Sequence, residues 1–184
     1  MILLTTMLGA QVQDNAQIEL TANLNTSMSL DIQSNAITFD FNTVSDYQNG
    51  LGANGNYSFA GSVTSTANWE LSIKSQQDSL KHSDGLHTIP LNYVGYKVEL
   101  TGNYGEQQIS NAAENIPVAL SGTATMVLTK ATQTNAGTID DNAFEIFWEM
   151  GTGNGNTNSI SLLQGNFKHG AYQTIIDFVL TEIL

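Results

Sequence analysis

The chain has 184 residues, of which 41% are hydrophobic and only 12% are charged, and its formal net charge is -12. This length is enough for one domain with its own core. Five lysines, no arginine and no basic run argue against binding to nucleic acid or to an anionic membrane, because both need cations that neutralise phosphate. The absence of cysteine excludes disulfides and thiolate chemistry.

The N-terminus is expected to be the remnant of a secretory signal. An apolar run at residues 2–8 precedes the small residues Gly9 and Ala10, as in the apolar region and cleavage zone of such signals. An ordinary first strand is the alternative. No stretch reaches the ~20 apolar residues that a membrane helix needs. We therefore expect residues 1–16 to be a signal remnant and extension, residues 17–184 to form one domain, and the protein to be secreted, at the cell surface or extracellular.

Alternation of apolar and polar residues predicts about ten strands. This period of two is typical of antiparallel sheets with one wet face. The predicted strands, in chain order, are residues 17–24, 28–32, 36–42, 57–66, 68–74, 93–101, 117–130, 143–150, 159–163 and 172–184. Helical periodicity is nearly absent: residues 107–115 are compatible with one helical turn, and residues 76–87 are expected to be an exposed loop.

The connections also favour β structure. Gly/Asn clusters at residues 49–56, 101–106 and 151–158 are rich in residues that tolerate the backbone angles of tight turns. Pro90 and Pro117 both follow isoleucine at a strand entry, where proline breaks no ladder. The fold prediction is all-β, a two-sheet antiparallel β-sandwich that is Ig-like or jelly-roll-like. A closed barrel is the alternative.

Both tryptophans lie in predicted strands. Trp69 shares one face with Leu71 and Ile73, so burial against a second sheet satisfies the whole strand, and we expect these three residues in the core rather than on a ligand platform. Trp148 lies in a strand with an aromatic residue on each face. There we expect a central strand with both faces partly covered, and a partner contact at Phe147 is the alternative.

No catalytic motif occurs, so neither a catalytic residue nor a cofactor is expected and the protein is not expected to be an enzyme. His82, Asp84 and His87 share one loop and offer metal ligands, but we interpret them as solvated loop residues. The candidates for calcium are Asp140, Asp141 and Glu145. Their spacing does not match an EF-hand loop, and a solvated acidic turn is the preferred interpretation.

Several segments resemble bacterial surface β-sandwich modules. The stretch "GAYQTIIDFVLTEIL" is similar to the terminal strand of spore-coat-protein-U-like pilin subunits, and the matching residues are Gly170, Tyr172, Ile176, Phe178 and Leu180. The chain lacks the cysteine pair usual in that family. A weaker resemblance to WxL cell-surface domains rests on Trp69-Glu70-Leu71. The second such motif is absent, and Trp148-Glu149-Met150 comes nearest to it.

The resemblance implies assembly by strand addition. The segment 17–33 would be a donor strand, and its side chains Ile18, Leu20, Ala22 and Leu24 would fill pockets along the sheet edge of a neighbouring subunit. Joining two different surfaces head to tail gives an open filament. The alternative is that these residues form the first strand of their own sandwich.

The expected function is therefore an exported structural subunit of a bacterial surface fibre, pilus-like filament or matrix, with adhesion as an associated role. Its partners would be copies of itself or other surface proteins. The alternative is a secreted carbohydrate-binding β-sandwich module, suggested by tyrosines that lie beside Asn/Gly turns; the six tyrosines are Tyr47, Tyr57, Tyr93, Tyr96, Tyr104 and Tyr172. A hydrolase that uses carboxylates near Asp140 is the third hypothesis.

Overall fold

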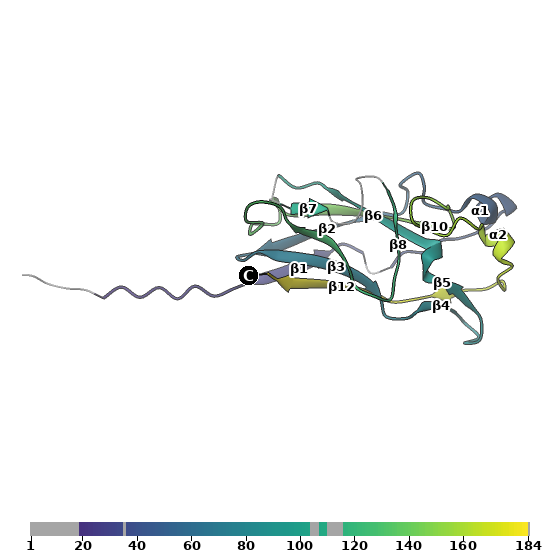
Figure 1. Ribbon diagram of the computed structural model, residues 1–184, viewed down its shortest axis with the longest axis horizontal. Coiled ribbons are helices and arrows are strands. Elements are labelled where there is room, and N and C mark those ends of the chain that lie inside the picture. The colour runs from purple at the N-terminus through teal and green to yellow at the C-terminus, as the bar shows by residue number, and fades with distance from the viewer. Residues whose placement is uncertain (1–18, 35, 104–106, 110–115, 184) are drawn as a thin grey trace, which may run out of the picture.

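Antiparallel sheets packed face to face make up most of the molecule (Figure 1). The computed structural model describes residues 19–34, 36–103, 107–109 and 116–183, so the predicted signal remnant at 1–16 lies outside the described residues. Every strand pairing between the described residues is antiparallel. The prediction of an all-β sandwich is confirmed. The strand order is open in each sheet, so no closed barrel forms in this part of the chain.

Two larger sheets form the sandwich, and a small one lies at one end. The first sheet has the order β1 (Met28–Ile32), β2 (Ser58–Ser65), β10 (Ala143–Met150), β6 (Val94–Leu100) and β8 (Val118–Ala119). The second has the order β12 (Ile176–Glu182), β3 (Trp69–Ser75), β9 (Thr125–Lys130) and β7 (Gln107–Ile109). The third consists of β11 (Tyr172–Gln173), β4 (Ser79–His82) and β5 (Thr88–Pro90). Thus β1 is one edge strand of the first sheet and β12 is one edge strand of the second.

The core lies between β3 and β10. Trp69 and Leu71 are 0% exposed and Ile73 is 1% exposed, which places the three predicted core residues inside the sandwich. Trp148 of β10 is also buried and packs against Tyr96, with ring centroids 5.4 Å apart. The alternation in both strands therefore places their apolar side chains on the two facing inner surfaces of the sandwich.

Trp69 is tied to a buried amide as well as packed. Its indole Nε1 donates to the backbone oxygen of Asn135 at 2.8 Å, and its backbone N–H donates to Asn135 Oδ1 at 3.0 Å. In return Asn135 Nδ2 donates to the backbone oxygen of Trp69 at 2.9 Å. Asn135 is itself 0% exposed, so these bonds replace the water that both residues lose on folding.

Short helices cap the far end of the sandwich. These are α1 (Val44–Asn49), α2 (Leu162–Gly165) and the 3-10 helix η1 (Leu91–Tyr93). Thr43 starts α1 with a capping box: its side chain accepts from the backbone N–H of Asp46, whose carboxylate accepts from the backbone N–H of Thr43. The T-x-x-D spacing is the sequence signal for this helix. No helix in the described part of the chain has the length and apolar character that a membrane crossing requires.

Several predicted elements were wrong. Residues 76–87 contain the strand β4 instead of an exposed loop, because Leu80 and His82 both turn inward. The predicted strand at 159–163 runs into α2, which Ser161 caps by accepting from the backbone N–H of Gln164. Residues 107–109 form β7 rather than a helical turn, and residues 110–115 lie outside the described residues. The predicted strand at 36–42 joins no ladder with the described residues, and neither do residues 19–24, the described part of the predicted strand at 17–24.

Replacing Asn135 with alanine is expected to destabilise the fold by about 2–4 kcal/mol, because the backbone N–H and C=O of buried Trp69 would lose their partners. The exposed Asn156 gives a matched control, and Asn156→Ala should change the free energy of unfolding by less than about 0.5 kcal/mol. Urea denaturation followed by tryptophan fluorescence measures both. Equal effects of the two substitutions would contradict this account of Trp69.

Candidate functional site

An exposed arm precedes the sandwich. The described residues 19–27 are all exposed and belong to no strand, and the chain runs away from the body here (Figure 1, purple). Leu20 is 93% exposed and Leu24 is 96% exposed. Of the predicted intersubunit residues, Leu20, Ala22 and Leu24 therefore lie on this arm, and Ile18 lies outside the described residues. The described part of the chain leaves both leucines uncovered.

The base of the arm is fixed to the body. Ser27 and Thr66 exchange two hydrogen bonds: Ser27 N–H donates to Thr66 Oγ1 at 2.9 Å, and Thr66 N–H donates to the backbone oxygen of Ser27 at 3.0 Å. Thr26 Oγ1 donates to Glu182 Oε1 at 3.1 Å. These contacts hold the arm at the C-terminal end of β12.

A groove of about 960 Å³ opens between the edges of the two larger sheets. One wall continues from the end of β1 through residues 36–42, and the other is the segment 167–178. The floor includes Phe59 and Trp148, and Phe59 meets Phe178 across the groove with ring centroids 5.9 Å apart. The groove therefore reaches the same core that Trp148 fills.

The walls of the groove are apolar but only partly covered. The large side chains that line the groove pack on the core but are only half-buried. They are Ile32, Ile37, Phe39, Phe41, Tyr172, Ile176 and Phe178. In contrast, the apolar side chains that β3 and β10 turn into the sandwich are almost fully buried. The core is thus closed in the middle of the sandwich and open along this edge.

One wall of the groove is built like a strand without a partner. Ile37, Phe39 and Phe41 are half-buried, and the alternate residues Thr38 and Asp40 are exposed. That pattern belongs to a strand with one buried face. Residues 36–42 join no ladder in the described chain, but nearby side chains bond the backbone of Ala36, the oxygen of Asp40 and the N–H of Asn42. An added strand would therefore pair with the middle of this wall first.

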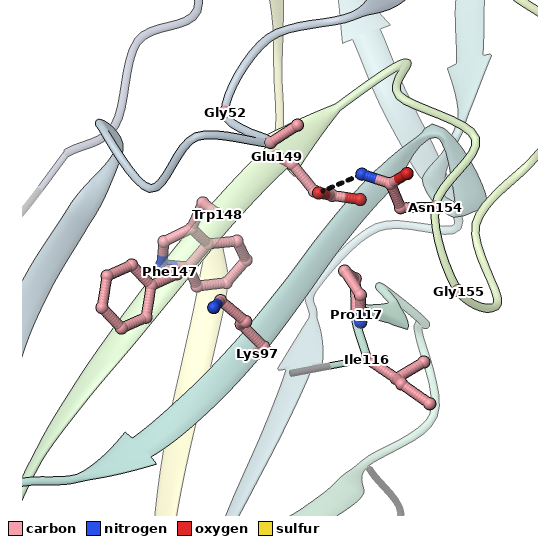
Figure 2. Close-up of a pocket in the computed structure, with 10 residues that line it drawn as sticks. Gly52, Lys97, Ile116, Pro117, Phe147, Trp148, Glu149, Asn154 and Gly155 are labelled. Carbon is pink, nitrogen blue, oxygen red and sulfur yellow. Dashed lines mark hydrogen bonds between the residues drawn. The ribbon is translucent and has the colours of Figure 1, made fainter. Parts of the chain in front are cut away.

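A second hollow, of about 400 Å³, lies on the outer face of β10 and β6 (Figure 2). Glu149 lines it and is only 5% exposed. Its carboxylate accepts from Thr152 Oγ1 and from Asn154 Nδ2. Beside it, Lys97 Nζ lies 4.7 Å from the centre of the Phe147 ring. The hollow thus combines a buried acceptor with an aromatic side chain.

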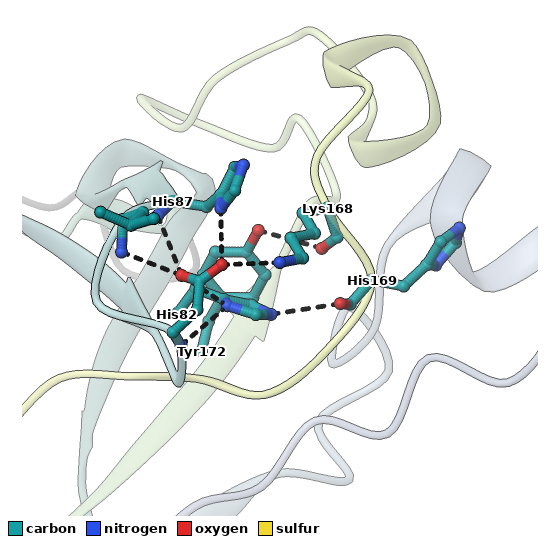
Figure 3. A network of polar contacts seen from close by, with 7 residues as sticks. His82, His87, Lys168, His169 and Tyr172 are labelled. Atoms are coloured by element: carbon teal, nitrogen blue, oxygen red, sulfur yellow. Dashed lines mark hydrogen bonds and ion pairs between the residues drawn. The ribbon is translucent and has the colours of Figure 1, made fainter.

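A polar network lies beside the groove, where the small sheet meets the segment 168–172 (Figure 3). Asp84 is at its centre: its Oδ2 accepts from Lys168 Nζ at 2.7 Å and lies 2.8 Å from His87 Nδ1. Tyr172 packs its ring on His82 and donates its hydroxyl to the backbone oxygen of Lys168. His82 was expected to be a solvated loop residue, but it is only 6% exposed, because β4 carries it inward.

The charges of this network shift two pKa values. The Lys168 ammonium, with the backbone N–H of Leu86, holds the pKa of Asp84 far below its usual range. Asp84 is therefore a carboxylate at every physiological pH. Burial raises the pKa of Tyr172, and the negative charge of Asp84 adds to the effect. Tyr172 consequently stays a neutral hydrogen-bond donor.

The predicted calcium candidates do not gather. Asp141 Oδ2 accepts from the backbone N–H and the hydroxyl of Thr138 within its own turn. Glu145 lies in β10 and accepts from Ser58 Oγ at 2.6 Å. Among the described residues, the metal-ligating atoms of His82, Asp84 and His87 come close together. None of the calcium candidates belongs to this group.

The tyrosines are also placed differently from the binding-module hypothesis. Tyr93 and Tyr96 are buried in the core, and Tyr104 lies outside the described residues. Tyr47, Tyr57 and Tyr172 are half-buried and pack on Phe41, Phe39 and His82, respectively. The five described tyrosines therefore form no exposed stacking surface.

Comparison with protein-family models and with curated proteins finds no match to this chain.

Proposed function

We propose that this protein is an exported structural subunit of a surface fibre, in which the N-terminal arm of one copy adds as a strand to the groove of the next. The observation that carries the proposal is one chain with an exposed apolar arm and an open apolar groove. Each feature supplies what the other lacks: the arm has uncovered leucines, and the groove has a half-covered core.

The dimensions of the two features agree. The alternating part of the arm, residues 18–24, has the same number of residues as the unpaired wall at 36–42. At about 3.3 Å per residue in a strand, each spans about 23 Å. A strand inserted between that wall and β12 would turn Leu20, Ala22 and Leu24 toward Phe59 and Phe178. The polar residues Thr21 and Asn23 would face solvent.

Strand addition would also satisfy the energetic needs of both partners. Full burial of a leucine side chain is worth roughly 1.5–3 kcal/mol, so Leu20 and Leu24 together favour insertion by several kcal/mol before the entropy cost of ordering the arm. The backbone of residues 36–42 and the free edge of β12 would gain ladder partners. Main-chain bonds then supply affinity and the alternating side chains supply register.

The position of the arm favours insertion into another copy. Thr26 is held at Glu182, whereas the groove lies at the opposite end of β12, at Ile176 and Phe178. To reach its own groove the arm would have to reverse direction at its base. Insertion into a neighbour needs no such reversal, and its repetition builds a chain of subunits.

Substitutions on the two faces of the arm test the proposal. We expect the double variant Leu20→Asp and Leu24→Asp to lose assembly, because the groove would have to bury two carboxylates. The matched variant Thr21→Asp and Asn23→Asp adds the same charge on the opposite face and should still assemble. Negative-stain electron microscopy and sedimentation velocity of the exported chain measure the result. Filaments in both variants, or monomers of the unaltered chain at every concentration, would refute the proposal.

The pairing can also be trapped, since the chain has no cysteine of its own. Cysteines placed together at Ala22 and Ile37 should form intermolecular disulfides and give a ladder of oligomers on a non-reducing gel. The pair at Asn23 and Ile37 is the control, because residue 23 would face away from the groove. A band of monomer alone from the first pair, on a folded protein, would count against insertion at this wall.

A carbohydrate-binding module is the second candidate, supported by the hollow at Phe147 and Glu149. A carboxylate beside an aromatic ring is a common way to hold a sugar, because the carboxylate accepts from hydroxyls and the ring packs on the apolar sugar face. We expect Phe147→Ala to abolish any signal that the unaltered protein gives on a glycan array. Val179→Ala, on an exposed side chain of β12, is the control. An array without signal for the unaltered protein removes this candidate.

A further inference from the structure

Three metal-ligating side chains converge at the β4–β5 hairpin. One ligand atom from each of His82, Asp84 and His87 lies within 4.8 Å of the others. The spacing is short in sequence, and the three residues come from the end of β4 and the loop that follows it (Figure 3). Two imidazole nitrogens and a carboxylate oxygen form a donor set typical of zinc sites.

The hairpin fixes these residues without the help of an ion. His82 N–H donates to the backbone oxygen of His87 at 2.9 Å, and Gly85 N–H donates to the backbone oxygen of His82 at 2.9 Å. Asp84 Oδ1 accepts from the backbone N–H of Leu86 at 2.9 Å. Gly85 has a φ of 74°, in the left-handed region that glycine adopts at little cost. The donor atoms are therefore held in place by the turn itself.

The ring of His82 is held at both of its nitrogens. Nε2 lies 3.1 Å from the backbone oxygen of His169, which only accepts hydrogen bonds, so Nε2 carries a proton. In the neutral ring Nδ1 accepts from the backbone N–H of Asp84 at 3.1 Å and also lies 2.8 Å from Asp84 Oδ1. A metal ion at Nδ1 would replace the bond from the Asp84 N–H and lie between the two electron-rich atoms. A bond from the second ring nitrogen to a carbonyl is also the usual support of a metal-bound histidine.

We propose that His82 Nδ1, Asp84 and His87 bind one zinc-class divalent transition-metal ion. Tetrahedral zinc at about 2.0–2.1 Å from each donor needs donor atoms about 3.3 Å apart, so Asp84 Oδ1 would move by about half an ångström from His82 Nδ1. The half-exposed His87 side chain can follow. Water would complete the coordination. The donor set disfavours calcium, which takes six to eight oxygen ligands.

Lys168 is a competitor within the site. Its ammonium lies 2.7 Å from Asp84 Oδ2, and its side chain is 47% exposed. A metal ion and this ammonium would share one carboxylate and repel each other. Binding of the ion therefore displaces or weakens the Lys168 contact. This competition distinguishes a metal site from a hydrogen-bonded turn, because removal of Lys168 weakens a turn but strengthens a metal site.

The full chain with zinc and cobalt chlorides tests the proposal at a pH of about 7.5, above the usual imidazole pKa of about 6.5. Calorimetric titration with zinc should give one ion per chain. Cobalt, as a spectroscopic substitute, should give the visible absorption of a tetrahedral nitrogen and oxygen site. We expect His87→Asn and Asp84→Asn to weaken zinc binding at least tenfold, and Lys168→Met to tighten it several-fold.

His169→Gln is the matched histidine control. Only the backbone oxygen of His169 contacts His82, and its ring lies near Tyr47 instead, so zinc affinity should not change. Far-UV circular dichroism of each variant verifies folding, and His87→Asn remains informative if Asp84→Asn unfolds, because His87 is exposed. No zinc or cobalt signal at millimolar metal, or equal losses in His87→Asn and His169→Gln, would overturn the proposal. This test does not depend on the proposed assembly through the arm, so either proposal can fail without the other.

Discussion

A core shared by two sheets has to be covered on every side, and this requirement governs the rest of the structure. In the middle of the sandwich, between β3 and β10, the requirement is met, and Trp69 and Trp148 are almost fully buried there. Between β1 and β12 it is not met, because the chain supplies no strand for the gap in its described part. Phe59 and Phe178 are consequently half-covered. The groove and its unpaired wall both lie at this gap between β1 and β12, and the proposed strand addition would fill it.

The sequence predicted the covered part of this fold well. Alternation at residues 69–73 is enough to assign an inner face, since Trp69, Leu71 and Ile73 have no other way to avoid water together. The same rule misleads at residues 36–42, where the side chains alternate as in a strand but no described segment pairs with them. Periodicity reports which face is apolar, and it contains no information on whether a backbone partner exists.

The candidate sites were harder to predict than the core, because they depend on contacts between segments that a local pattern does not show. Alternation at residues 17–24 predicted a strand, but the described residues 19–24 join no ladder, because pairing and burial depend on partners that the local sequence does not show. His82, Asp84 and His87 were assigned to a solvated loop, because one short alternation at Leu80 and His82 was too weak a signal for β4. Their convergence follows from the return of the chain at Gly85. The hollow at Glu149 brings β10 together with Gly52 and Pro117, which are far from it in the sequence, and no local pattern shows that they meet.

The attachment of Thr26 to Glu182 has a consequence for any fibre built from this protein. Because the arm leaves from one end of β12 and the groove opens at the other, every subunit must point the same way along the filament. The two tips then differ in kind: one presents a vacant groove with exposed core, and the other presents an unused arm. Growth and termination would need different chemistry at each tip, and a single molecule that fills the last groove would suffice to set the length.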